Sequence, residues 1–190
     1  NDANGDTVYY AFDQRDAGSG FTLAAGDPGS GPIIRPLLPS TSNVRTIPAW
    51  PWLLTNSAPL GETLPTTTRA LAFRAVARDN RRGVHSLFFS LNVTNTGTPF
   101  ALTSPNGGGT LSGSIPVTWN VAGTTASPIN AANVSIRLST DGGNTWPTVL
   151  AANTPNDGTE MVTLPSLTTS TARIRVQPVG NIFFDISNAN

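Results

Sequence analysis

The sequence contains no cysteine and no lysine, and among its 190 residues there are one histidine and two glutamates. Without cysteine, neither a disulfide framework nor a thiolate metal site can form. With His85 as the single histidine, both an H-E-x-x-H zinc motif and a three-histidine zinc site are excluded. Glu62 and Glu160 stand in loop-like contexts, so a glycosidase pair would have to use scattered Asp residues. The sequence therefore predicts no catalytic constellation.

Charge and long apolar runs are also scarce. Eleven arginines balance eleven acidic residues, and charged residues make up 12% of the chain, so we expect no nucleic-acid partner. No apolar run reaches the ~18 residues of a membrane span, which predicts no membrane insertion. Thr, Ser, Asn, Gly and Pro are abundant, a composition that disfavours helices and supplies turns. It is typical of an all-β protein that is secreted or lies on the cell surface.

Apolar residues alternate along the first half of the chain in a period of two, which indicates half-buried strands. Three runs show this pattern, "TVYYAFDQ", "RALAFRAVARDN" and "HSLFFSLNV". In the last run Phe88 interrupts the polar face, so its side chain is expected to cover a neighbouring loop or a partner. We predict a first β-module over residues 1–95, of which these are the reliable strands.

A Pro- and Gly-rich segment at about residues 17–68 separates the first strand from the other two. So long a segment without structure is unusual in a compact domain, so we interpret it as an ordered insertion with one helical turn near "AWPWLL". Trp50 and Trp52 would either anchor this insertion to the sheet or form a stacking platform for a sugar or peptide. Anchoring is the more common use of tryptophan, and the binding platform stays open as an alternative.

The second half contains seven strand-like runs separated by turn residues, which predicts an antiparallel sandwich of immunoglobulin or fibronectin type III architecture over residues 99–190. Alternation places Val117, Trp119 and Val121 inward, with similar triplets in two later strands. By the same alternation, Arg137, Arg173 and Arg175 should lie on a solvated face. The segment "NTGTP", residues 95–99, is the expected boundary between the modules.

The first module has too few strands for a complete sandwich, since a closed module needs two sheets. We therefore expect an immunoglobulin-like module that lacks its first strands. Such a module leaves a sheet edge that a neighbour could cover by strand addition.

The opening "NDANGDT" is a candidate calcium-binding turn. Asp2, Asn4 and Asp6 offer hard oxygen ligands at alternate positions, and Asp79 at the end of a strand could approach the same end of the module. The turn does not follow the EF-hand pattern, because its Gly comes too early and no glutamate closes the loop. Turns rich in Asp and Asn are more often closed by their own hydrogen bonds than by a metal. No other cofactor is indicated.

The stretch "STDGGNTW", residues 139–146, resembles the Asp-box repeat of sialidases. Its residues also suit a plain hairpin. Asp141 can accept backbone N–H groups, Gly142 and Gly143 tolerate positive φ, and Trp146 can fold over the turn. The motif occurs once, whereas a propeller needs repeats, so we interpret it as a structural turn.

Taken in order, several longer segments resemble the C-terminal non-catalytic region of secreted bacterial reprolysin-like (metzincin) zinc metalloproteases. They are "GETLPTTTRALAFRAVARDN", "PFALTSPNGG", "VTWNVAGT", "IRLSTDGGNTWPTVLAANTPNDGT", "TARIRVQPVGNIFFDISNAN" and the opening "DANGDTVYYAFDQ". The resemblance implies a secreted parent enzyme whose zinc domain lies upstream. The chain departs from the family pattern after "RDN", where Arg81, Arg82 and Phe88 replace Gly-rich and acidic residues, and this weakens the calcium prediction.

From these observations we predict accessory modules that act as a spacer or bind the substrate or partner of a secreted metalloprotease. Two alternatives remain open. The chain could bind a glycan or a protein polymer outside the cell, through Trp50 and Trp52. It could also be an adhesive or structural surface protein that associates through its open sheet edge.

Overall fold

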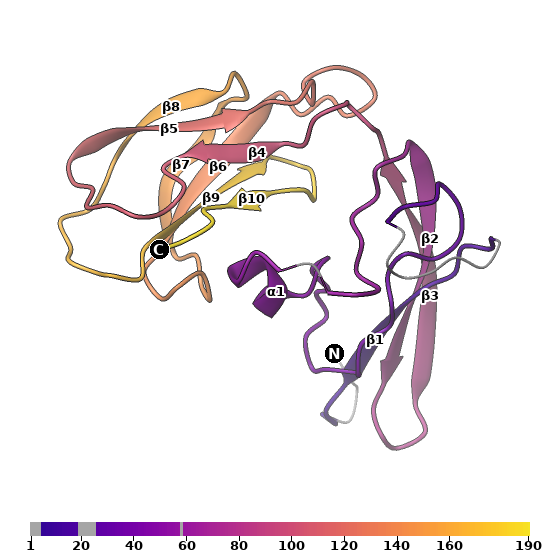
Figure 1. Cartoon of the computed structure of the whole chain (residues 1–190). Coiled ribbons are helices and arrows are strands. Elements are labelled where there is room, and N and C mark those ends of the chain that lie inside the picture. The colour runs from indigo at the N-terminus through magenta and orange to yellow at the C-terminus, as the bar shows by residue number, and fades with distance from the viewer. Residues whose placement is uncertain (1–4, 19–25, 58) are drawn as a thin grey trace. The chain divides into compact units, whose positions relative to one another are not determined.

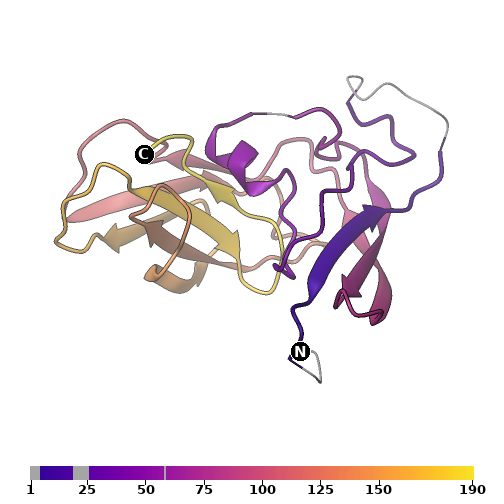
Figure 2. The same ribbon diagram turned by 90° about the horizontal axis from the view of Figure 1, so that it is seen from below.

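A computed structural model describes residues 5–18, 26–57 and 59–190 of the chain. Within them the protein is nearly all-β, with ten strands in antiparallel sheets and one short helix, which confirms the predicted class. The chain divides into two compact units, Asn1–Asn95 and Thr96–Asn190, and the division falls at the start of the expected "NTGTP" boundary. Figures 1 and 2 show the strands of each unit in two views.

Unit 1 is built on one antiparallel sheet with the order β1-β2-β3. Its strands are β1 (Tyr9–Gln14), β2 (Arg69–Arg78) and β3 (Val84–Val93). They coincide with the three runs of alternating apolar residues, so these strand predictions are confirmed. The β2–β3 ladder is continuous over ten residue pairs, from Arg69 opposite Val93 to Arg78 opposite Val84. Because opposite residues share a face, the alternation of β2 also fixes which side chains of β3 face the core.

One face of this sheet is covered by the long segment between β1 and β2. Ile33 and Ile34 of that segment are buried against Leu71 and Phe73 of β2, and Phe73 stacks on Phe89 of β3. The Gln14 side-chain oxygen accepts the N–H groups of Ile33 and Ile34 at 2.8 Å, which satisfies two buried donors. The segment also contains the helix α1 (Trp50–Leu54), where a helical turn is expected. We call the face that carries Phe73 and Phe89 the core face, and the opposite one the outer face.

Unit 2 consists of two antiparallel sheets around a shared apolar core. The first sheet has the order β4-β5-β8, and the second has the order β10-β9-β6-β7. The bounds are β4 (Ala101–Ser104), β5 (Ser114–Asn120), β6 (Asn133–Ser139), β7 (Thr148–Pro155), β8 (Thr159–Thr163), β9 (Arg173–Pro178) and β10 (Asp185–Ile186). Each predicted run of the second half overlaps one of these strands. Val117 and Trp119 from the first sheet pack with Val134, Ile136 and Val176 from the second.

The predicted solvated face of arginines in unit 2 is wrong for Arg173. Its side chain is buried, its Nε donates to the Asn190 side-chain oxygen at 2.9 Å, and its Nη1 donates to the Ser187 carbonyl at 3.3 Å. The C-terminal residues therefore cover a position that alternation alone assigns to solvent. Arg175 is also partly covered, since its guanidinium lies between the rings of Trp146 and Phe184.

Candidate functional site

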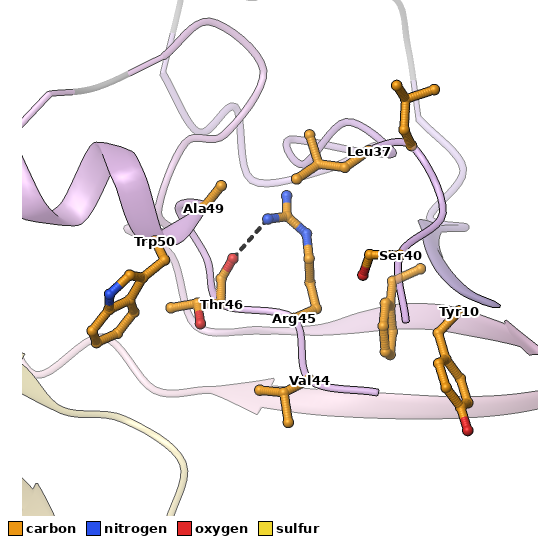
Figure 3. Close-up of a pocket in the computed structure, with 10 residues that line it drawn as sticks. Tyr10, Leu37, Ser40, Val44, Arg45, Thr46, Ala49 and Trp50 are labelled. Carbon is orange, nitrogen blue, oxygen red and sulfur yellow. Dashed lines mark hydrogen bonds between the residues drawn. The ribbon is translucent and has the colours of Figure 1, made fainter. Parts of the chain in front are cut away.

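Unit 1 contains a cavity of about 210 Å³ at the outer edge of β1, beside the segment that joins β1 to β2. Apolar side chains form most of its lining: Tyr10, Phe12, Leu37, Leu38, Val44 and Trp50. Figure 3 shows Tyr10 and Trp50 at opposite ends of the cavity with Arg45 between them. Leu38 and Val44 are 91% and 70% exposed, far more than aliphatic side chains that close a core. The cavity is therefore an apolar site that is open to the surface.

One side of the cavity is held in place by a charged cluster, in which Arg35 and Arg45 surround the buried carboxylate of Glu62. One carboxylate oxygen accepts Nη2 of Arg45 at 2.8 Å and lies 3.8 Å from Nε of Arg35. The other oxygen accepts the N–H of Ala49 at 2.5 Å, immediately before α1. Arg45 also donates through Nη1 to the carbonyl of Thr46 at 2.8 Å, the bond drawn in Figure 3. Because both oxygens of the buried Glu62 carboxylate have partners, they fix the backbone at Ala49 and the guanidinium of Arg45 relative to each other.

A backbone bridge adds to this anchoring. Tyr10 N–H donates to the Ser40 carbonyl at 2.7 Å, and Ser40 N–H donates to the Tyr10 carbonyl at 3.0 Å. Both residues line the cavity, so this bridge joins its β1 side to the connecting segment. The cavity thus depends on long-range contacts between β1, residues 34–50 and Glu62.

The two tryptophans proposed as a platform do not share one surface. Trp50 is partly buried and lines the cavity, whereas Trp52 is 39% exposed and is not part of the lining. Residues two apart on a helix point in different directions, so α1 cannot present both rings to one ligand side by side. Binding at Trp50 and Trp52 stays a prediction, and the structure associates the cavity with the first of them.

The calcium prediction rests on four residues, of which Asp2 and Asn4 lie outside the described residues. Asp6 pairs with Arg81, with 3.2 Å between its Oδ1 and Nε. Asp79 Oδ1 accepts the backbone N–H groups of Arg81 at 2.7 Å and of Gly83 at 2.8 Å. These contacts bring Asp6 and Asp79 to the same end of unit 1, as expected, and Arg81 lies between them. Calcium binding stays a prediction, which calorimetric titration with calcium would test.

The Asp-box-like hairpin uses its polar side chains inside the turn. Asp141 Oδ1 accepts the hydroxyl of Ser139 at 2.7 Å and the N–H of Thr145 at 2.9 Å, and Oδ2 accepts the Thr145 hydroxyl at 2.6 Å. These bonds, those from Thr145 first, lower the pKa of Asp141 to about 2. Gly142 and Gly143 have φ values of +76° and +94°, as the sequence predicts. The carboxylate closes the hairpin, which agrees with a structural turn.

Trp146 of the same hairpin lies over the second sheet of unit 2. The guanidinium carbon of Arg175 stands 5.1 Å from the Trp146 ring centroid and 5.6 Å from that of Phe184. Burial, together with the charge of the opposite Arg137, lowers the pKa of Arg175 below its ordinary value. The hairpin is thus fastened to β9 by the cation–π contact with Arg175 and to β6 by a hydrogen bond from Nη1 of Arg137 to the Trp146 carbonyl at 3.1 Å.

The structure also bears on the metal sites and membrane spans that the sequence does not predict. Across residues 5–18, 26–57 and 59–190, no three His, Asp or Glu side chains gather into a metal-binding group. His85 lies exposed on β3, and Glu160 accepts the hydroxyl of Thr154 within unit 2. In the same ranges, no helix has the length and apolar character needed to cross a membrane.

Sequence reasoning missed the two carboxylates that organise unit 1, Glu62 and Asp27. Asp27 accepts N–H groups of Gly29, Thr66 and Thr67 and pairs with Arg69 at 3.0 Å. Burial by itself raises the pKa of Asp27, but these bonds outweigh it and lower the pKa to about 2. Local sequence carries a weak signal for such residues, since their partners lie up to 42 positions away. The rarity of glutamate in this chain is the one hint that Glu62 has a special place.

Comparison of the chain with protein-family models finds no match, and comparison with curated proteins finds no significant one.

Proposed function

We propose that the two units are non-catalytic accessory modules of a secreted protein, a metalloprotease, and that unit 1 binds an apolar segment of a protein substrate or partner. The observation that supports this proposal is the cavity at β1, where exposed Leu38 and Val44 surround a rigid apolar surface. Ligand sites typically combine such a lining with a few fixed polar groups. Here the lining includes the hydroxyl groups of Ser40 and Thr46.

The lining favours protein over glycan. Sugar sites need planar hydrogen-bonding side chains next to an exposed aromatic face, and the described lining contains no carboxylate and no side-chain amide. The guanidinium of Arg45 is already used by Glu62 and Thr46. Leu37, Leu38 and Val44 instead offer aliphatic contact, which suits a Leu, Met or Phe side chain of an extended polypeptide.

Retention on insoluble polymers tests this site. We expect the protein to bind collagen or a similar protein polymer, and Leu38→Asp with Val44→Asp to abolish retention, because charge in the cavity opposes apolar contact. Val179→Asp is the matched control, since Val179 is an exposed valine of unit 2. Retention on polysaccharide that depends on Trp50 would support the glycan alternative, and unchanged retention of the double variant would contradict the proposal.

For unit 2 we propose an immunoglobulin or fibronectin type III sandwich. Seven antiparallel strands in sheets of three and four, with the first, second and fifth strands of the unit in the smaller sheet, support it. For unit 1 we propose an immunoglobulin-like module without its first strands, supported by the one sheet that the described residues of this unit form, with Ile33, Ile34 and Ile47 on its core face.

The metalloprotease parentage is supported by the order of the resembling segments along the chain. The complete reading frame tests it directly. An H-E-x-x-H-x-x-G-x-x-H motif upstream of this region is expected. A complete frame that lacks any zinc-protease motif would leave the adhesive or structural surface protein as the better proposal.

A further inference from the structure

The two edges of the unit 1 sheet differ in the backbone hydrogen bonds that they form. The outer edge of β1 is bridged by Ser40, which forms two backbone hydrogen bonds with Tyr10. On the opposite edge, β3 pairs with β2 along its whole length, and no second strand pairs with β3 in the described part of the chain. Alternate residues of this ten-residue strand therefore direct backbone N–H and C=O groups outward at the edge, and such a row is a template for another strand.

The edge strands of unit 2 carry the features that usually prevent pairing. β4 has an irregular register and four residues, β10 has two residues, β7 has register shifts and ends at Pro155, and β8 is short and contains Glu160. Short length, bulges, proline and charge all discourage edge-to-edge association. β3 has none of them, because its register is regular over ten pairs and "VHSLFFSLNV" contains no proline, Asp, Glu, Lys or Arg.

β3 also exposes three large apolar side chains. Val84 and Phe88, on the outer face, are 58% and 67% exposed, and Leu87, on the core face, is 60% exposed. Exposed aliphatic and aromatic residues on both faces of one uncharged edge strand are unusual for a surface that meets only water.

We propose that β3 pairs antiparallel with β3 of a second copy of this chain, with Phe88 opposite Phe88 at the two-fold axis. The two sheets then form one continuous six-stranded sheet. The occupant is inferred from the strand itself, since a two-fold interface must be complementary to its own sequence.

The sequence around Phe88 meets this requirement. In the proposed register Leu87 lies opposite Phe89, and Ser86 lies opposite Ser90, so that apolar side chains meet apolar ones and hydroxyls meet hydroxyls. The rings of the two Phe88 residues meet on the outer face. Moving the register by two residues would place Phe88 opposite Ser86 or Ser90, which gives up the aromatic pair. No ionic repulsion opposes the pairing, because His85 is the only titratable side chain of the strand.

This inference is independent of the proposed binding function. The cavity is lined from β1 and residues 37–50, and β3 contributes nothing to its lining. A failure of self-association would therefore leave polymer binding untouched, and a failure of polymer binding would leave the dimer untouched.

Sedimentation equilibrium on the full chain is the first test. Over about 10 µM to 1 mM, the range of weak interfaces, we expect the apparent mass to rise to twice that of the monomer. Phe88→Lys should remain monomeric, since it places two like charges opposite each other at the axis. Ile182→Lys is the matched control, because Ile182 is also 67% exposed, and this variant should still dimerise. A wild-type chain that stays monomeric throughout would overturn the proposal.

Disulfide cross-linking of introduced cysteines tests the register of the proposed β3–β3 pair. The native sequence has no cysteine, so any disulfide must join introduced residues. Opposite residues have Cα atoms ~4.5–5.5 Å apart, which a disulfide can span, so oxidised Phe88→Cys should form a covalent dimer. Ser86→Cys alone should not, because its two copies would lie ~14 Å apart along the strands. A mixture of Ser86→Cys and Ser90→Cys should link while Phe88 is retained. Linking of Ser86→Cys to itself as readily as Phe88→Cys would refute this register.

Discussion

At the scale of single residues, the buried side-chain amide of Asn156 connects several parts of unit 2 by hydrogen bonds. Its side-chain oxygen accepts Nε1 of Trp119 at 2.7 Å, and its Nδ2 donates to the Thr124 hydroxyl at 3.0 Å and the Ala131 carbonyl at 2.9 Å. Each of these groups is buried or close to the core of unit 2. The amide therefore joins the turn between β7 and β8, where Asn156 lies, to β5 and to the connection between β5 and β6.

Asn156→Ala should destabilise unit 2 by about 2–4 kcal/mol, because it leaves buried polar groups without partners. Chemical denaturation followed by tryptophan fluorescence would measure the change. Asn153→Ala, an exposed asparagine on β7, is the control and should change the free energy of unfolding little. Equal effects of the two substitutions would contradict the role assigned to the buried amide.

Asp27 gives unit 1 a defined response to acid. Its pKa is about 2 in the folded chain against 3.8 for an ordinary Asp, so ionised Asp27 stabilises the folded state above pH ~3.8. That contribution, about 2 kcal/mol, is lost as the pH falls from ~3.8 towards ~2. Asp27→Asn should remove this part of the pH dependence and lower stability at pH 7. Denaturation curves across this pH range would show it, and an unchanged profile would contradict the assignment.

At the scale of elements, the Asp141 hairpin is held in shape by hydrogen bonds between its own residues. We expect Asp141→Ala to lower the Tm of unit 2, since the N–H and hydroxyl of Thr145 lose their acceptor. Asp141→Asn keeps one acceptor oxygen and should have a smaller effect. Calorimetry separates the two. If Asp141→Ala instead left the Tm unchanged and abolished a binding activity, the hairpin would be a recognition element.

The strands and the long connecting segment differ in how well sequence predicts them. β2 and β3 follow from alternation, because each has one face on a core and a period of two is enough to specify it. The described residues between β1 and β2 follow no period, and side chains hold single positions among them. Gln14 holds Ile33, Asp27 holds Thr66 and Glu62 holds Ala49. The proposed cavity therefore could not be found from local pattern, although Trp50 pointed to the right part of the chain.

At the scale of the molecule, each unit has its own apolar cluster, and that of unit 2 draws ten buried residues from both of its sheets. A stretch of 95 residues is enough to bury an independent core. We therefore expect residues 96–190 expressed alone to unfold in a single cooperative transition. Its amide NMR spectrum should overlay that of unit 2 in the whole chain. A molten or aggregated fragment would contradict this division.

The sequence by itself determined the all-β class, ten strand positions and the turn chemistry of the hairpin, because these depend on neighbours a few residues apart. Other features depend on contacts between residues far apart in the sequence, which only the tertiary structure shows. Those contacts bury Arg173 under the C-terminal residues and hold Arg45 against Glu62. Among residues 5–18, 26–57 and 59–190, no strand pairs with the second edge of β3. The alternation of apolar residues indicates which face of a strand a side chain lies on. Only the folded chain shows which distant residues cover that side chain.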